Sequence, residues 1–139
     1  MLFRSGPGGL RARTGTVLQG AAANDSFGFA VAGAGDINGD GYADFAVGAI
    51  NASPGMRRLA GTVSVYPGSA AGFGAPRVIE GAELATYFGW SLASLGDLDG
   101  DGFTDLGVGS PLSSAAGRSS CGAVSIFRGG PGEIGRAHV

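Results

Sequence analysis

The chain repeats itself after 61 residues, and this period constrains its fold more than any other feature of the sequence. Residues 27–68 align with residues 88–129 without a gap, and 17 of the 42 aligned pairs are identical. Most of the differences are conservative, such as Ile37 against Leu98 and Tyr42 against Phe103. A period near 60 residues suits a unit of four short strands with an inserted loop. The sequence therefore predicts consecutive units of a repeat architecture rather than one ordinary domain.

Composition and hydrophobic patterning predict that each unit is made of strands joined by turns. Glycine accounts for 29 of the 139 residues, but hydrophobic residues make up 44%, which argues against disorder. The third segment of each unit alternates valine or isoleucine with serine, as a half-buried strand does. The first segment carries mostly small residues, which suit a crowded innermost strand. No helix is expected. The predicted strands are 29–34, 44–49, 61–66 and 77–80 in the first unit, 90–95, 105–110 and 122–127 in the second, and 16–19 as the earlier counterpart of 77–80.

The two ends of the chain fit the repeat less well than its middle. Residues 2–6 resemble the end of a third strand, and no fourth strand is expected after residue 129. Residues 133–139 match neither unit and read as a translation of a widely used sequencing-adapter sequence, so His138, the only histidine, receives no function. We therefore expect residues 1–20 to end a preceding unit, 21–81 to form one unit, 82–132 to form a second that lacks its last strand, and 133–139 to be a non-native tail.

Seven of the eleven acidic residues lie in two nonapeptides with the pattern Asp-x-[Asn/Asp]-x-Asp-Gly-x-x-Asp. Side-chain oxygens at positions 1, 3, 5 and 9 can converge on one hard cation if the chain curls tightly around it. Glycine at position 6 permits the sharp turn, and the carbonyl at position 7 points inward whatever its side chain. The candidate ligands are Asp36, Asn38, Asp40, the Tyr42 carbonyl and Asp44 in the first loop, and Asp97, Asp99, Asp101, the Phe103 carbonyl and Asp105 in the second.

These ligand sets favour calcium, in two sites. Five or more protein oxygens in a flexible loop suit calcium better than magnesium, and zinc or copper would need histidine or cysteine. The first site is expected to bind more weakly, because Asn38 is neutral. An EF-hand is excluded, because position 12 is Val47 or Val108 instead of glutamate. The alternative is that these residues only form turns; two copies at identical repeat positions argue against it.

Other classes of function find less support in the sequence. The net charge of −2 favours neither a nucleic-acid partner nor a membrane surface, and no apolar run is long enough to span a membrane. No nucleophile has a plausible general base, and the paired aspartates that could imitate a glycosidase already fit cation positions. Cys121, the only cysteine, can form no internal disulfide and leaves the cellular compartment open.

The residues that flank the acidic loops carry a resemblance to a known family. Phe27-Gly28, then the first loop, then Val47–Ala49 resembles the FG-GAP repeat of integrin α-chain propellers. Phe88-Gly89, the second loop and Gly109–Pro111 are closer still to its Phe-Gly…Gly-Ala-Pro signature. The resemblance implies an all-β fold of four-stranded antiparallel β-propeller blades, here a partial propeller of about two blades, with a calcium loop between the first two strands of each.

The same resemblance implies what the chain does. It indicates a non-enzymatic calcium-binding module of a secreted or cell-surface β-propeller, with a structural and interaction role in cell adhesion or in binding an extracellular protein or glycan. Its other partners would be further blades, with no nucleic acid and no membrane insertion in this segment. The alternative is an accessory propeller of a secreted hydrolase, since similar repeats occur beside hydrolase domains. The extracellular location rests on the resemblance, because the N-terminal residues lack the pattern of a signal peptide.

Overall fold

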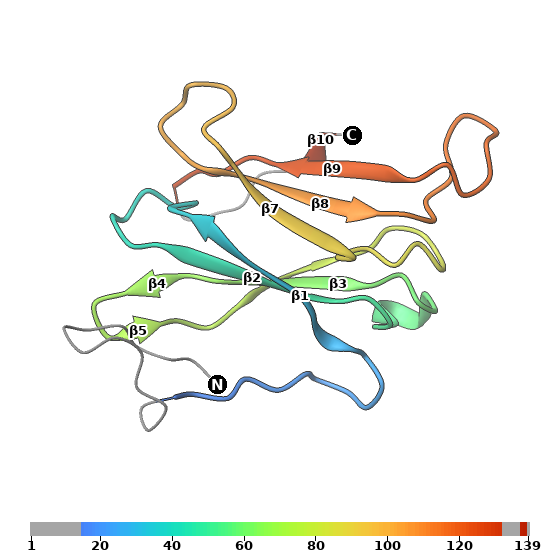
Figure 1. Ribbon diagram of the computed structural model, residues 1–139, viewed down its shortest axis with the longest axis horizontal. Helices are drawn as coiled ribbons and strands as arrows, with labels where there is room; N and C mark the ends of the chain where they lie inside the picture. The colour runs from blue at the N-terminus through green and yellow to red at the C-terminus, as the bar shows by residue number, and fades with distance from the viewer. Residues whose placement is uncertain (1–14, 132–136, 139) are drawn as a thin grey trace.

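A computed structural model describes residues 15–131 and 137–138, which form two four-stranded antiparallel sheets and one small hairpin (Figure 1). The first sheet has the strand order β1-β2-β3-β6, and the second has the order β7-β8-β9-β10. The strands of the first sheet are β1 (Phe27–Gly35), β2 (Asp44–Ala49), β3 (Thr62–Tyr66) and β6 (Arg77–Glu80). Those of the second are β7 (Ser91–Gly96), β8 (Asp105–Ser110), β9 (Ala123–Phe127) and β10 (Ala137–His138), and the hairpin is β4 (Gly68–Ser69) with β5 (Gly72–Phe73).

The strand pattern confirms the predicted all-β fold of four-stranded propeller blades. β2, β6 and β8 begin and end at the predicted residues, and β3 and β9 start one residue later than predicted. A 3₁₀ turn, Pro54–Met56, lies in the loop between β2 and β3. Across the described ranges, no helix has the length and apolar character needed to cross a membrane.

Two expectations about the ends of the units were wrong. Residues 16–19, expected to be a strand, form none, because no strand within the described residues lies beside them to complete a ladder. The second sheet does have a fourth strand, since the two residues of β10 pair with Ile126 and Phe127 of β9. The segment 2–6, expected to end a third strand, lies outside the described residues, and the non-native origin of residues 133–139 stays a prediction.

The main core lies between the two sheets. Ala46, Val63 and Val65 contribute to it from the first sheet, and Leu106 and Val108 face them from the second. Leu106, Val63 and Val108 are the largest fully buried apolar side chains among the described residues. Burying a side chain of this size contributes about 1.5–3 kcal/mol. The two blades therefore hold each other mainly by aliphatic packing.

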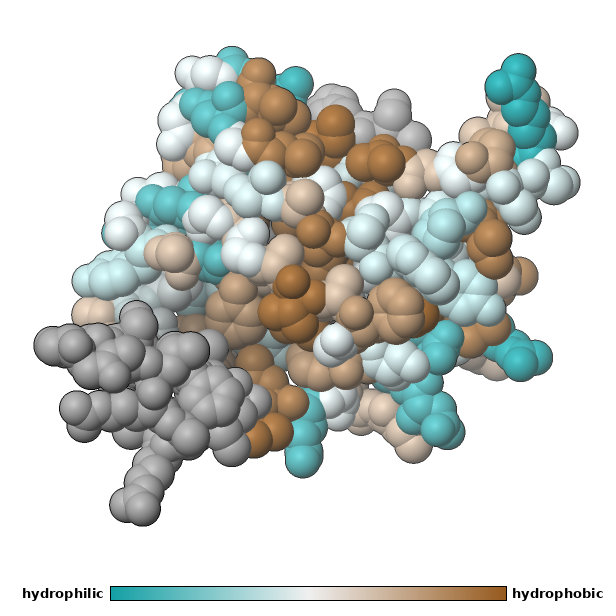
Figure 2. All heavy atoms as spheres, in the orientation of Figure 1, coloured by the Kyte–Doolittle hydropathy of each residue, from teal (hydrophilic) through white to brown (hydrophobic). Residues whose placement is uncertain are grey.

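The first strands of the two blades, β1 and β7, are edge strands that lie beside each other. About half of their residues are exposed instead of crowded, because in the described part of the chain two blades alone meet here. Phe29 and Trp90 stack in a tilted pair across the two strands, with ring centroids 4.8 Å apart. Figure 2 shows hydrophobic residues gathered in a band down the middle of this view, where β1 and β7 cross in front of the other strands in Figure 1.

Candidate metal centres

Both acidic loops close the hairpin between the first two strands of a blade. In the first blade the loop follows β1 and runs directly into β2, where Gly35 pairs with Asp44. In the second blade the loop joins β7 to β8, where Gly96 pairs with Asp105. The 61-residue repeat thus places two loops of the same design on corresponding ends of neighbouring sheets.

The aspartate at position 1 organises each loop through its carboxylate. Oδ1 of Asp36 accepts hydrogen bonds from the amides of Gly39 (2.8 Å) and Asp40 (3.1 Å), and Oδ2 accepts one from Gly41 (2.9 Å). Asp97 makes the corresponding three bonds at 2.8, 3.0 and 2.8 Å. Gly41 has a φ of +87°, which L-residues rarely adopt, so glycine at position 6 is required by the turn, as predicted.

The residues at positions 3 and 5 support the same curled backbone. Asn38 and Asp99 each accept a hydrogen bond from the amide two residues later, at 3.2 Å in both loops. Asp40 and Asp101 do the same at 2.9 and 3.0 Å. Each of these bonds uses one side-chain oxygen, and carboxylate oxygens have further acceptor capacity.

The aspartate at position 9 is buried and joins its loop to the end of the third strand. Oδ2 of Asp44 accepts from the amide of Ile37 (2.8 Å) and Oδ1 from that of Gly68 (2.8 Å). Asp105 is 1% exposed and accepts the corresponding bonds from Leu98 (2.9 Å) and Gly129 (3.1 Å). Its carboxylate is thus held by two backbone amides in a place that water hardly reaches.

Three carboxylates converge in the second loop. Asp97, Asp99 and Asp105 each offer an oxygen, and these three atoms lie within 4.8 Å of one another. One calcium ion can span that separation, because ligands on opposite sides of the ion are about 5 Å apart. Hydrogen bonding, first of all from the Gly102 amide, lowers the pKa of Asp97, whereas desolvation and then the neighbouring charge of Asp101 raise the pKa of Asp99. The cluster therefore concentrates negative charge that a cation would neutralise.

An arginine lies beside this second cluster. Nε of Arg128 is 3.3 Å from Oδ2 of Asp99, and both side chains are partly exposed. The corresponding residue of the first blade is Pro67, which carries no charge. Arg128 would therefore compete with any metal ion for one oxygen of the cluster.

The two loops contact each other across the blade boundary. The amide of Thr104 donates to the carbonyl oxygen of Asp36 at 3.2 Å, and the amide of Gly130 donates to that of Ile37 at 2.9 Å. The ring of Phe103 covers Gly39 so closely that an added Cβ there would lie 2.5 Å from a ring carbon. Fixing the backbone conformation of one loop therefore restricts the backbone conformations open to the other loop.

In the second loop the structure brings together three of the predicted ligands. These are Asp97, Asp99 and Asp105, and the carboxylate of Asp101 is not among them. Metal ligation by all ten predicted residues, including the carbonyls of Tyr42 and Phe103, stays a prediction.

Sequence reasoning missed three residues that the structure places at the loops. Gly68 and Gly129 bind the buried aspartates, and their identity at the repeat spacing was a signal that could have revealed them. Arg128 gave no such signal, because its counterpart is proline.

Stacked four-stranded antiparallel sheets, each with an acidic loop between its first two strands, define blades of a β-propeller. The profile of the FG-GAP repeat matches residues 27–66 and 88–127, and the chain belongs to the FG-GAP repeat family.

The relatives of the chain confirm this assignment. It is 41% identical to integrin alpha-5 of Xenopus laevis over 113 residues, which cover 78% of the chain and 10% of that protein. It is 39% identical to human integrin alpha-IIb over 119 residues (81% of the chain, 11% of that protein). It is 38% identical to integrin alpha-V of Gallus gallus over 107 residues (74% and 10%). The chain thus spans about a tenth of the length of these relatives.

Proposed function

We propose that both acidic loops bind calcium and that the ions are structural. The observation that carries the proposal is the cluster of Asp97, Asp99 and Asp105, whose oxygens lie within 4.8 Å of one another with Asp105 almost fully buried. A buried carboxylate beside two others is unfavourable unless a cation neutralises the group. The first loop has the same hydrogen-bond pattern, which supports a second site there.

The ions would act by fixing the ends of the hairpins. Neutralising the aspartates removes their mutual repulsion and holds the first strand of each blade to the second. Because the loops also contact each other, the ions would stiffen the boundary between the blades. Sites of this kind in extracellular modules bind calcium with Kd of about 10⁻⁴–10⁻³ M. Calcium at 100 times the Kd would add about 2.7 kcal/mol of stability for each site.

Substitution of one exposed ligand tests this role. Asp101→Ala should lower the free energy of unfolding in calcium and have little effect in chelator, because the side chain is exposed and accepts a hydrogen bond from the Phe103 amide within its own loop. Glu83→Ala removes the same charge from an exposed loop outside both sites and serves as the control. An equal loss for Asp101→Ala in calcium and in chelator would mean that the loop is a plain turn.

We further infer an interaction role at the cell surface or in a secreted protein, in adhesion or in binding an extracellular protein or glycan. Residues 21–81 and 82–132 would be successive blades, with residues 1–20 ending an earlier one. The integrin alpha relatives support adhesion over the alternative, an accessory propeller of a secreted hydrolase. We propose no catalytic role. The sequence of the complete gene tests this inference, since an adjoining hydrolase domain would overturn it.

A further inference from the structure

Two tripeptides of the first blade have the pattern Asn-x-Ser with a middle residue other than proline. One is Asn-Asp-Ser at residues 24–26, in the turn before β1, and the other is Asn-Ala-Ser at residues 51–53, in the loop after β2. Neither belongs to an acidic loop. In a secreted protein this pattern is an acceptor for N-linked glycans when it lies on a surface loop.

The repeat does not require asparagine at either place. Ala85 is the counterpart of Asn24 in the second blade, and Leu112 is the counterpart of Asn51. Asn24 has a φ of +66° and Ala85 a φ of +54°, so both turns use the same left-handed backbone. Because alanine makes the turn as well, the fold alone does not account for the asparagine.

The turn before the first strand stays open on a blade that has neighbours. Asn24 is exposed although a second blade follows its own, and Ala85 is exposed although a first blade precedes its own. Neither a preceding nor a following blade therefore covers this position. The side chain of Asn24 also makes no hydrogen bond with the part of the chain that the structure describes. Its amide nitrogen is accessible and has space for a bulky group.

The second asparagine is held by the first tripeptide. Nδ2 of Asn51 donates a hydrogen bond to the hydroxyl oxygen of Ser26 at 2.8 Å. The backbone amide of Asn51 donates to the carbonyl oxygen of Asp25 at 3.1 Å, and the residue is partly buried. Asn51 thus ties the loop after β2 to the turn that carries Asn24, and its side-chain amide already has a structural use.

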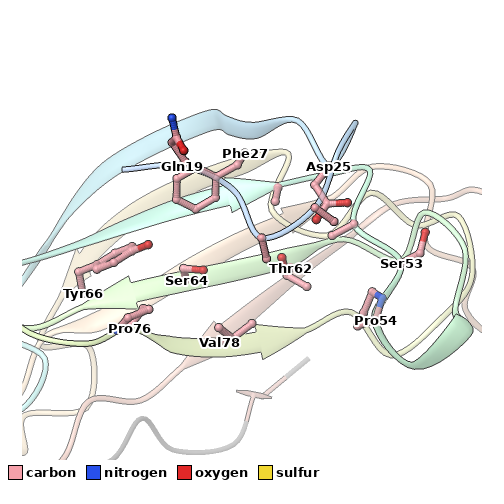
Figure 3. Close-up of a pocket in the computed structure, with 14 residues that line it drawn as sticks. Gln19, Asp25, Phe27, Ser53, Pro54, Thr62, Ser64, Tyr66, Pro76 and Val78 are labelled. Atoms are coloured by element: carbon pink, nitrogen blue, oxygen red, sulfur yellow. The ribbon is translucent and has the colours of Figure 1, made fainter. Parts of the chain in front are cut away.

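Figure 3 shows where the two tripeptides meet. Asp25 of one and Ser53 of the other line the same groove, with Pro54 next to Ser53. A residue that precedes proline is restricted to extended backbone, and Ser53 has a φ of −122°. The second tripeptide therefore has less freedom to bring its hydroxyl group back towards its amide in the active site of a transferase. It is the poorer acceptor of the two.

We propose, on the basis of the secreted or cell-surface location in the proposed function, that Asn24 carries an N-linked glycan and that Asn51 does not. In the transfer, Nδ2 of Asn24 forms a bond to the anomeric carbon of an oligosaccharide carried on a polyprenyl pyrophosphate. The bond between that carbon and the pyrophosphate oxygen breaks, and the lipid pyrophosphate leaves with the electron pair. The amide gives up one of its two protons to a base of the transferase.

The glycan would stand well away from the calcium loops. Asn24 precedes β1 and the first acidic loop follows it, so the nine residues of the strand separate them. Figure 1 shows the turn before β1 and the acidic loop after it at opposite ends of the strand. A glycan on Asn24 should therefore leave calcium binding unchanged.

Secretion of the full chain from eukaryotic cells, behind a cleavable signal peptide, tests the assignment. The secreted chain should show a single shift in electrophoretic mobility that peptide N-glycosidase removes. Asn24→Gln should abolish the shift. Ser53→Ala destroys the second tripeptide but keeps the bond from Asn51 to Ser26, and it should retain the shift. A secreted chain without a shift, or a shift that persists in Asn24→Gln, would overturn the proposal.

Mass spectrometry of the unmodified chain places the glycan without any substitution. The glycosidase leaves aspartate where a glycosylated asparagine stood. Because the chain has arginine but no lysine, trypsin releases both candidate positions in one peptide, residues 14–57, and fragment spectra assign the aspartate within it. Aspartate at position 24 alone is the expected result. Aspartate at position 51 would contradict the assignment even if a variant failed to fold.

Calcium titration of the secreted chain, before and after glycosidase treatment, separates this inference from the proposed function. Both forms should bind calcium equally. A secreted chain that carries no glycan but binds two calcium ions would overturn the glycan site and leave the calcium sites standing. A chain that carries a glycan on Asn24 but binds no calcium would support the glycan site and contradict the calcium sites. Because the signal peptide is supplied, neither result depends on the natural location of the protein.

Discussion

Gly61 allows the packing of the two blades to be tested with a single methyl group. It precedes β3 with a φ of +84°, and a Cβ added there would lie 2.2 Å from the carbonyl oxygen of Phe88 and 2.7 Å from its nitrogen. Its repeat counterpart Gly122 has a φ of +79°, but an added Cβ there meets nothing closer than the Pro111 oxygen at 3.3 Å. The two glycines therefore share a backbone conformation and differ in what surrounds them.

The expected losses of unfolding free energy follow from the shared conformation and from the different surroundings. Alanine in a left-handed conformation costs about 1–2 kcal/mol at either position. At Gly61 the methyl group also collides with backbone of Phe88, whose amide donates to the Ala60 carbonyl oxygen at 3.0 Å and cannot retreat freely. Overpacking of this kind adds about 1–3 kcal/mol. We expect Gly61→Ala to lower the free energy of unfolding by about 2–5 kcal/mol and Gly122→Ala by about 1–2 kcal/mol.

Urea unfolding followed by tryptophan fluorescence measures both losses. Trp90 is the only tryptophan and stacks on Phe29 of the other blade, so its emission reports on the separation of the blades. Both variants are compared with the unmodified chain in calcium at the same protein concentration. Equal losses for the two variants would refute the described contact between Gly61 and the second blade.

Four further substitutions address the acidic loops, each measured by calcium titration. Asn38→Asp adds a carboxylate to the first loop and should raise the calcium affinity of its site about fivefold, since a charge pair about 4 Å apart in water is worth about 1 kcal/mol. An unchanged affinity would exclude Asn38 as a ligand. Arg128→Gln removes the cation beside Asp99 and should strengthen the second site by up to about fivefold, as for an exposed ion pair; weaker binding would show that the arginine supports the site. Gly39→Ala should weaken calcium binding at both sites, because its methyl group reaches the ring of Phe103 in the second loop. In Gly100→Ala the methyl group meets nothing within 4 Å, so only the second site should be weakened. Identical effects of the two substitutions would contradict coupling between the loops.

The repeat made most of the fold predictable from sequence. A shift of 61 residues fixed the equivalence of the units, and alternation in segments such as 122–127 located strands to within a residue or two. The prediction failed at residues 16–19 and at β10, where strand formation depends on whether a neighbouring strand is present to pair. Local sequence carries little information about that neighbour.

The acidic loops were predictable for a different reason, since their ligands are close together in sequence. The contacts that support them are not local. Gly68 reaches Asp44 from 24 residues away, and Arg128 reaches Asp99 from the end of β9. The contact of Phe103 with Gly39 joins different blades and depends on how the sheets stack. Such contacts follow from tertiary packing, which no single-loop motif specifies.

Calorimetric titration of the chain with calcium tests the central claim most directly. The chain is first treated with chelator and then dialysed, and magnesium is titrated in parallel as the control. Two binding events with Kd of about 10⁻⁴–10⁻³ M, lost one at a time in Asp36→Ala and Asp97→Ala, are the predicted result. Absence of heat above background from the folded, chelator-treated chain would contradict the assignment of both loops as calcium sites.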